Sequence, residues 1–356
     1  MEKYYINPDI KYAETLPASF YRSDEAWDFL QEQLFARSTQ WLGDYRDFVN
    51  PNQNACPLTI FQEPLIAIKG QNQKLDLLSN VCTHRGNIIL HQPGQVKNLK
   101  CMYHGRQFKK DGSFLRMPEF EDAQDFPRPC DNLKKFKTSN IGPFHFVSFS
   151  QLIDIDRIIE QMNDRIGFLP LDSFKRDVEL SKDYIVNSHW ALYCDNYLEG
   201  FHIPFVHEDL NEVLDYGSYD TVLYEQMNLQ IGYSDEPKDC FSLPEGHPDY
   251  GKNVAAYYYW VFPNMMFNFY PWGLSVNIVK PINKNRTKVS FISYVCDYNR
   301  LDSGAGALLD KVEREDEFVV ENVHKGLKSQ FYKNGRFSPT REQGVHHFHR
   351  LLSELF

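Results

Sequence analysis

The sequence lacks any apolar run of the roughly 20 residues that a membrane-spanning helix requires. Its most apolar stretch, residues 255–272, is interrupted by two prolines and two asparagines. The first residues, Met-Glu-Lys-Tyr-Tyr, also lack the apolar core of a secretory signal peptide. We therefore expect no membrane partner and a location in the cytoplasm.

Positive charge is also scarce. The chain has 38 Lys and Arg residues against 48 Asp and Glu residues, which gives a net charge of −10. Proteins that bind nucleic acid neutralise phosphates with a basic surface. The composition therefore argues against a nucleic-acid partner, whereas an acidic surface could still attract a cationic substrate or a basic protein.

Cysteines are few, seven in 356 residues, and they are scattered through the chain. An odd number at irregular spacing does not predict a disulfide framework in a protein of this length. This distribution predicts reduced thiols or metal ligands in a cytoplasmic protein. Aromatic residues, by contrast, are abundant, with 27 Phe and 21 Tyr, and they predict roomy apolar interiors.

Apolar periodicity divides the chain into three segments. Residues 1–40 are expected to be mainly helical, with Ser23 as the N-cap of one helix. Residues 41–150 show short apolar runs separated by turns, which is the pattern of a small all-β domain. Residues 151–356 mix alternating strands with amphipathic helices. We expect the strands at 178–187, 255–270, 274–280 and 287–296, and the helices at 154–166, 308–331 and 341–356.

Four potential metal ligands lie within the all-β segment. They form two short motifs, Cys82-Thr-His84-Arg-Gly86 and Cys101-Met-Tyr-His104-Gly105. Two thiolates and two imidazoles could hold tetrahedral zinc, but zinc fingers usually draw two cysteines from one loop and two histidines from another. One cysteine and one histidine from each loop suits a Rieske 2Fe–2S centre, in which two histidines replace cysteines on one iron. Neither loop has a further cysteine for a bridging disulfide, so we expect a centre of low potential.

A second group of ligands lies in the segment Asp195-Asn-Tyr-Leu-Glu-Gly-Phe-His-Ile-Pro-Phe-Val-His207. Glu199 and His202 are three residues apart and would share a helical face. Pro204 disfavours a continuous helix, so His207 is expected to return from a distorted turn or a fresh helix. Two imidazoles with a nearby carboxylate are typical of a non-haem iron(II) site. Histidines packed among aromatic residues are the alternative interpretation of this segment alone.

Together the two groups resemble the α (oxygenase) subunit of the Rieske non-haem iron ring-hydroxylating oxygenases. The resemblance covers nearly the whole chain and is strongest to the branch of choline- and carnitine-type monooxygenases. It rests on the two cysteine–histidine loops, on residues 195–207, and on tail segments that include Gly335-Arg336 and Glu342-x-Gly344. The resemblance implies an α+β fold. It implies a helical segment (1–40) that packs on the catalytic domain, a Rieske domain (41–150), and a catalytic domain (151–356) with a helix-covered antiparallel sheet of the helix-grip type.

The resemblance also implies roles for individual residues. Cys82, His84, Cys101 and His104 would hold the 2Fe–2S cluster. Asp316 would join His202 and His207 on mononuclear iron(II), with Glu313 and Glu315 as the alternatives. Glu199, where many members carry aspartate, would link an iron-ligating histidine to a Rieske histidine of another subunit. Asn196 and Asp195 would support the site, although Asp195 could equally be a capping residue. Arg106 departs from the tryptophan that usually follows Tyr-His-Gly.

The implied function is that of a terminal oxygenase. The sequence has no Gly-x-Gly-x-x-Gly nucleotide site, so a separate NAD(P)H reductase with flavin and 2Fe–2S, or a ferredoxin, would supply electrons. A homotrimer or a multiple of it would hydroxylate a small organic substrate with O₂, possible outcomes being N- or O-dealkylation. The alternatives are an aromatic-ring cis-dihydroxylating dioxygenase and a Rieske electron carrier without oxygenase activity.

Aromatic residues are expected to line the substrate pocket. The candidates are Phe205, Trp260, Phe267 and Tyr270. A quaternary ammonium substrate would be held on such rings by cation–π attraction. Because strand side chains alternate between faces, only half of the strand residues would face the cavity, and the others would form ordinary sheet core.

Overall fold

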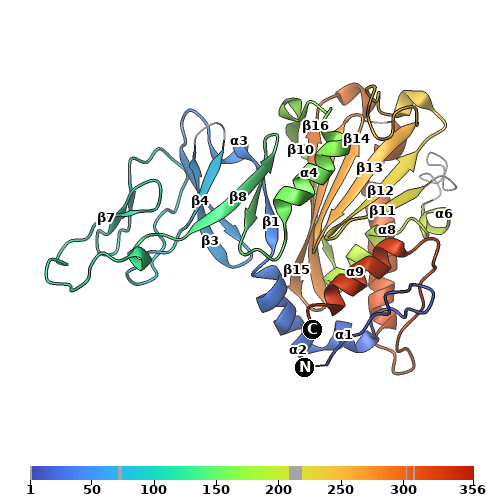
Figure 1. Ribbon diagram of the computed structural model, residues 1–356, viewed down its shortest axis with the longest axis horizontal. Coiled ribbons are helices and arrows are strands. Elements are labelled where there is room, and N and C mark those ends of the chain that lie inside the picture. The colour runs from blue at the N-terminus through green and yellow to red at the C-terminus, as the bar shows by residue number, and fades with distance from the viewer. Residues whose placement is uncertain (1, 71–73, 208–218, 302, 308) are drawn as a thin grey trace. The chain divides into compact units, whose positions relative to one another are not determined.

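The computed structural model describes residues 2–70, 74–207, 219–301, 303–307 and 309–356. The chain forms two units, one of residues 35–159 and the other of residues 1–34 with 160–356. The combination of a β domain and a larger sheet-and-helix domain confirms the expected α+β fold (Figure 1). In the described parts of the chain, no helix is long and apolar enough to cross a membrane.

The smaller unit is built on a six-stranded antiparallel sheet in the order β1-β9-β8-β4-β3-β2. A three-stranded sheet, β5-β6-β7, lies in the same unit. The bounds are β1 (Thr39–Asp44), β2 (Ala55–Ile60), β3 (Glu63–Lys69), β4 (Leu75–Ser79), β5 (Leu99–Lys100), β6 (Gln107–Phe108), β7 (Phe114–Arg116), β8 (Lys135–Ile141), β9 (Phe144–Ser148), α3 (Tyr45–Phe48) and η2 (Pro129–Asp131).

The two cysteines of the predicted cluster motifs belong to the core of this unit. Cys82 and Cys101 are 2% and 1% exposed and pack with Ile66, Leu78 and Phe108. Burial of these apolar side chains anchors both loops to the sheet. The loops are therefore fixed by the same core that stabilises the unit.

The larger unit contains a seven-stranded antiparallel sheet in the order β10-β16-β15-β14-β13-β12-β11. Its strands β13, β14 and much of β15 are buried along their length, so both faces of the central sheet are covered. The bounds are β10 (Lys175–Val186), β11 (Asp220–Leu223), β12 (Met227–Tyr233), β13 (Val254–Val261), β14 (Met265–Tyr270), β15 (Gly273–Asn283) and β16 (Arg286–Val295).

The strand expected at 255–270 is in fact two strands joined by a turn at residues 262–264. Pro263 lies in this turn, and a proline cannot donate to the ladder of a central strand. The expected tight turn between 274–280 and 287–296 is present, and Asn285 N–H donates to the Asn283 side chain across it. The other predicted strands are confirmed within a few residues.

Among the described residues, the helices are short except for α4, α8 and α9. Their bounds are α1 (Ala18–Arg22), α2 (Asp24–Leu30), α4 (Ile155–Ile166), α5 (Trp190–Tyr197), α6 (Ile203–Val206), α8 (Leu309–Gly326) and α9 (Gln343–Ser353), with a π-helix η1 (Gln31–Phe35) and 3₁₀ turns η3 (Leu171–Ser173), η5 (Pro237–Asp239), η6 (Tyr298–Arg300) and η7 (Gly304–Gly306). Helix α5 contacts β15, α8 and α9, and these helices lie beside the large sheet (Figure 1).

The helix boundaries agree with the sequence pattern to differing degrees. Ser23 is an N-cap as predicted, because its hydroxyl accepts a hydrogen bond from the Ala26 N–H at 3.1 Å. The helical character expected through residue 40 ends at Phe35, since residues 39 and 40 already pair in strand β1. The helix expected at 308–331 ends at Gly326, a poor helix former, and its first residue lies outside the described chain.

Candidate metal centres

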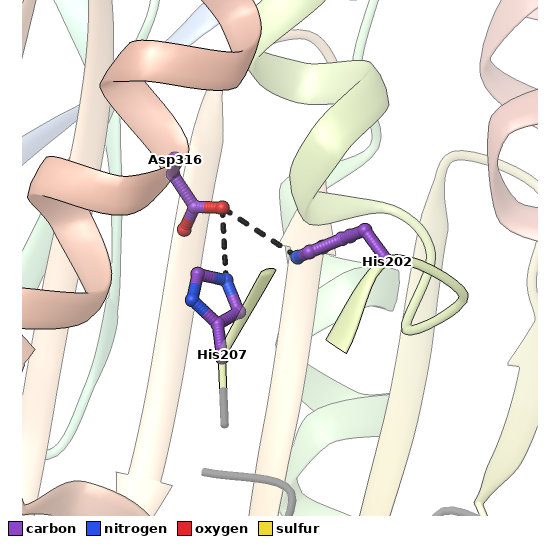
Figure 2. Close-up of side chains that lie close together, drawn as sticks. All are labelled: His202, His207 and Asp316. Carbon is purple, nitrogen blue, oxygen red and sulfur yellow. Dashed lines mark hydrogen bonds and ion pairs between the residues drawn. The ribbon is translucent and has the colours of Figure 1, made fainter. Parts of the chain in front are cut away.

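Three side chains of the larger unit converge on one point (Figure 2). The Nε2 atom of His207 lies 3.0 Å from Oδ1 of Asp316, and Nε2 of His202 lies 3.5 Å from the same oxygen. One ligand atom from each residue falls within 4.8 Å of the others. Two imidazole nitrogens and one carboxylate form the facial donor set of non-haem iron(II) sites, so the residues present fit that ion.

The segment around Pro204 explains how two histidines five residues apart reach one point. His202 ends a turn, and a fresh four-residue helix, α6, begins at Ile203 with Pro204 in its first turn. Proline is tolerated there because the first helical N–H groups have no partner within the helix. His207 then caps the other end of α6 and returns to the same site, as the sequence pattern predicted.

Each histidine has a carboxylate on its second ring nitrogen. Nδ1 of His202 donates to Oε1 of Glu199 at 2.7 Å, and Nδ1 of His207 donates to Oε2 of Glu315 at 2.7 Å. Such partners fix the tautomer and leave Nε2 free to bind a metal. Glu315, an alternative ligand in the sequence analysis, therefore orients a histidine instead, and its partnership with His207 was not foreseen.

The electrostatics of the site favour a positive charge. Burial opposes a charge on His207, but the carboxylates of Asp316 and Glu315 outweigh it and raise the pKa of this imidazole above its ordinary value. Asp316 is only partly exposed, so its charge is poorly screened by solvent. A cation bound between these side chains would be stabilised by the same charges.

Glu199 also organises its own turn. Its Oε2 accepts hydrogen bonds from the backbone N–H groups of Phe201 and His202, while Oε1 holds the imidazole of His202. The carboxylate is thus fixed by three donors. Such fixation gives His202 a single orientation.

A cavity opens beside the three converging side chains. Its wall is rich in tyrosines and amides, and it includes two of the residues that the sequence proposed near the site, Asn196 and Glu199, and one proposed pocket residue, Tyr270. The remaining lining residues are Tyr193, Tyr197, His202, Ile203, His207, Tyr219, Gln230, Tyr258, Asn268, Asn277, Phe291, Ala305, Leu309, Val312, Glu313 and Asp316.

The other three proposed pocket residues do not line this cavity. Phe267 points to the opposite sheet face from Asn268, because strand side chains alternate. Trp260 packs on Phe348 of α9, with ring centroids 5.1 Å apart. Phe205 is 78% exposed and lies at a separate surface hollow together with Phe318.

Asp195 faces away from the cavity although Asn196 lines it. Its two carboxylate oxygens lie 2.9 Å from Nε2 of His349 and 3.3 Å from the Tyr21 hydroxyl. His349 in turn accepts the Leu16 N–H at 3.0 Å. These bonds tie α5 to α9 and to the N-terminal segment, so Asp195 holds the helix that carries Asn196.

The cysteine–histidine loops form a second convergent group in the smaller unit. Nδ1 of His84 lies 3.2 Å from Nδ1 of His104. Two nitrogens bound to one metal at about 2.1 Å would be separated by a similar distance. The thiols are buried and the imidazoles are partly exposed. The donor set and its arrangement therefore fit a Rieske cluster, whose histidines share one iron.

The two loops have the same backbone geometry. In each loop, the cysteine N–H donates a hydrogen bond to the carbonyl oxygen five residues later. The Cys82 N–H donates to Asn87 O and the Cys101 N–H to Arg106 O, both at 2.8 Å. Gly86 and Gly105 have φ values of 70° and 75°, which few residues other than glycine adopt. Burial raises the pKa of Cys101, but hydrogen bonds from the Tyr103 N–H and the Asn87 amide outweigh it and lower the pKa overall, whereas burial raises the pKa of Cys82.

Arg106 connects the loops to each other. Its guanidinium is buried, donates to Oδ1 of Asp131 at 2.7 Å, and lies 5.1 Å from the centre of the Phe114 ring. The Thr83 hydroxyl of the first loop donates to the Asp131 carbonyl at 2.8 Å. The arginine that replaces the expected tryptophan thus has its own anionic and aromatic partners.

Known families match both parts of the chain. The model of the ring hydroxylating alpha subunit (catalytic domain) matches residues 171–355, and that of the Rieske [2Fe-2S] domain matches residues 40–130. Choline monooxygenase of Arabidopsis thaliana is 28% identical over 96% of this chain and 82% of its own. The carnitine monooxygenase oxygenase subunit of Escherichia coli (strain K12) is 26% identical over 100% of this chain and 96% of its own.

Solved structures share the fold. The quaternary ammonium Rieske monooxygenase CntA in complex with L-carnitine aligns with a TM-score of 0.74 at 22% identity, over 98% of this chain and 97% of that one. Naphthalene 1,2-dioxygenase with indole bound aligns with a TM-score of 0.71 at 15% identity, over 96% and 92%.

Proposed function

This chain belongs to the Rieske ring-hydroxylating oxygenase α-subunit family, and we propose that it is the terminal oxygenase of a monooxygenase acting on a quaternary ammonium compound. The observation that carries the proposal is the convergence of His202, His207 and Asp316 beside a cavity walled by tyrosines. Relatives named for choline and carnitine oxidation extend over almost the whole chain.

We assign the metal ligands residue by residue. Cys82 and Cys101 would hold one iron of the 2Fe–2S cluster, and His84 and His104 the other. The mononuclear iron(II) would be held by three further residues, His202, His207 and Asp316. When bound, the iron activates O₂ and the cluster supplies electrons one at a time.

The chain's own residues provide orientation around this chemistry. Glu199 and Glu315 each hold one histidine through Nδ1, which keeps both Nε2 atoms directed at the same point. Two buried tyrosines, Tyr193 and Tyr270, line the cavity beside this point. We expect one oxygen atom of O₂ to enter a C–H bond beside the substrate nitrogen, while two electrons and two protons reduce the other atom to water.

The cavity wall suits a positively charged substrate. Aromatic rings such as Tyr258, Tyr270 and Phe291 line it. Each ring that faces an ammonium contributes about 0.5–2 kcal/mol of cation–π attraction. A neutral aromatic substrate, as in a cis-dihydroxylating enzyme, would make no use of Glu313, the carboxylate of this wall that contacts neither of the two histidines.

Electrons must come from a separate reductase, as the assignment to an oxygenase subunit implies. We propose a homotrimer or a multiple of it, in which Glu199 links His202 to a Rieske histidine of a neighbouring subunit. The fixed position of Glu199 on His202 Nδ1 supports this role. A reducing cytoplasm would suit the chain, because its cysteines form no disulfide and two of them are proposed cluster ligands.

Metal and sulfide analysis tests the proposal at its first step. Anaerobically prepared protein should contain three irons for two acid-labile sulfides, one iron more than a Rieske electron carrier would hold. His202→Ala should remove one iron and leave the red-brown cluster spectrum intact. Two irons for two sulfides, unchanged by this substitution and by added iron(II), would leave only an electron carrier.

Turnover tests the substrate class. The iron-loaded enzyme, supplied with a reductase and NADH, should consume O₂ in the presence of choline or a related quaternary ammonium and form an aldehyde. A cis-diol formed from an aromatic hydrocarbon, with no reaction of any ammonium compound, would instead identify a ring dihydroxylase.

A further inference from the structure

One carboxylate in the cavity wall has no role in the arrangement described so far. Glu313 lies on α8, three residues before Asp316, and is 2% exposed. Its Oε2 accepts a hydrogen bond from the Tyr193 hydroxyl at 2.5 Å. Its Oε1 is buried and has no hydrogen-bond partner among the described residues.

The neighbouring charged residues of α8 face elsewhere. Glu315 holds His207, and Arg314 pairs with Glu317 at 2.9 Å on the outer side of the helix. Arg314 also lies over the Tyr184 ring, 4.8 Å from its centre. Glu313 is therefore the acidic group of this helix that enters the cavity without a counter-charge beside it.

Apart from the residues proposed to hold iron or to orient its ligands, the described wall of the cavity contains an acid and no fixed cation. Glu199, Glu313 and Asp316 line it, and no lysine or arginine does. An ionised carboxylate without a partner is expensive to bury. Burial raises the pKa of Glu313 well above its ordinary value, because an ionised carboxylate here has no positive charge beside it.

The position of Glu313 suits a cation that is to be oxidised. Residues three apart on a helix lie about 5–6 Å apart, so Glu313 and Asp316 are neighbours on the cavity face of α8. An ammonium group beside Glu313 would place its methyl or methylene carbons one helical turn from the proposed iron ligand. Tyrosine rings of the same wall would surround the cation's other sides.

We propose that Glu313 is the counter-ion of the substrate's ammonium group. The pocket therefore selects quaternary ammonium compounds that carry no acidic group, such as choline, over zwitterions with a carboxylate, such as carnitine. Away from the proposed iron site, a substrate carboxylate would meet Glu313 and no lysine or arginine in the described wall. This inference rests on the proposed function and specifies the substrate class of the same site.

Calorimetric binding to the anaerobic, iron-loaded enzyme tests the inference with three probes. Choline is a cation, 3,3-dimethylbutan-1-ol is its neutral carbon isostere, and L-carnitine adds a carboxylate. Wild-type enzyme should bind choline at least about tenfold more tightly than either other probe. Glu313→Gln, which keeps an acceptor for Tyr193, should weaken choline binding about tenfold and change binding of the neutral isostere by less than about twofold.

A matched control removes a charge from the same helix outside the cavity. Glu317→Gln should leave the affinities of all three probes unchanged, and iron content should be the same in both variants. Glu313→Asp, which restores the charge, should recover part of the choline affinity. Equal weakening of choline and the neutral isostere, or no change in either, would overturn the assignment of Glu313.

The outcomes also separate this inference from the proposed function. A wild-type preference for choline that survives Glu313→Gln would retain the quaternary ammonium substrate and reject Glu313 as its counter-ion. Carnitine binding as tight as choline binding would reject the selection against carboxylates. Failure of wild-type enzyme to bind or oxidise either ammonium compound would reject the proposed function together with the inference.

Discussion

Nε2 of His207 lies 3.0 Å from Oδ1 of Asp316, although 109 residues separate them in the chain. His207 ends the short helix α6, and Asp316 lies in the middle of α8. The metal site is therefore assembled only when these two helices pack in the same unit. Substitutions of single residues around the site can therefore test what each residue contributes.

Glu199→Gln is expected to impair electron delivery without removing either metal centre. Glutamine can still contact His202, but it carries no charge and presents only one acceptor oxygen. We expect product formation to fall by about 10- to 100-fold. With iron(II) in excess, the visible cluster spectrum and substrate binding should stay as in the wild type, and recovery of full activity on addition of iron(II) would show a purely structural role.

Glu315→Gln should weaken iron binding. The carboxylate that holds Nδ1 of His207 is lost, so the imidazole is less basic and less firmly oriented. Substitution of such partners typically lowers metal affinity by about 10- to 100-fold. Competition with a chelator measures the affinity, and Glu317→Gln on the same helix serves as the control, with unchanged retention expected.

Arg106→Met should destabilise the smaller unit. The substitution leaves Asp131 without the guanidinium that pairs with it at 2.7 Å. Breaking a buried ion pair by removing one partner costs about 3–5 kcal/mol. Thermal unfolding followed by cluster absorbance should show the loss. The double variant Arg106→Met, Asp131→Asn should recover part of it, and an unchanged melting temperature in the single variant would contradict the assignment.

Asp249 should make the stability of the larger unit depend on acid pH. Burial raises its pKa, but Arg165, Lys252 and Tyr257 outweigh this effect and lower the pKa below its ordinary value. A lowered folded-state pKa stabilises the protein above the unfolded-state value of about 3.9, and this stabilisation is lost as the pH falls through the folded-state pKa.

The free energy of unfolding in urea, measured for the wild type and for Asp249→Asn from about pH 7 to acid pH, tests this expectation. Asp249→Asn should be less stable than wild type at pH 7, and the gap should narrow as the pH falls below about 4. The exposed Asp235→Asn should follow the wild-type curve throughout. A gap independent of pH would mean that Asp249 acts by packing alone.

The sequence by itself determined the parts of the sites whose residues are neighbours in the chain. Cys82 and His84, Cys101 and His104, and Glu199 and His202 each lie within a few residues, so local turn geometry brings each pair together. The fresh helix at Pro204 was predictable for the same reason, since proline restricts the backbone locally. Asp316 came only from the family resemblance, because an acidic run offers several equivalent candidates.

The tertiary structure decided which residue of a pattern faces which partner. Alternation predicts that half of the aromatic strand residues face a cavity, but only the packed structure shows that Tyr270 lines it and that Trp260 packs on Phe348 instead. Glu313, Glu315 and Asp316 look alike in the sequence. In the structure, Glu313 enters the cavity, Glu315 contacts His207 and Asp316 is the proposed iron ligand. Which carboxylate takes which position depends on how α8 is rotated against α5 and α6, and long-range packing sets that rotation.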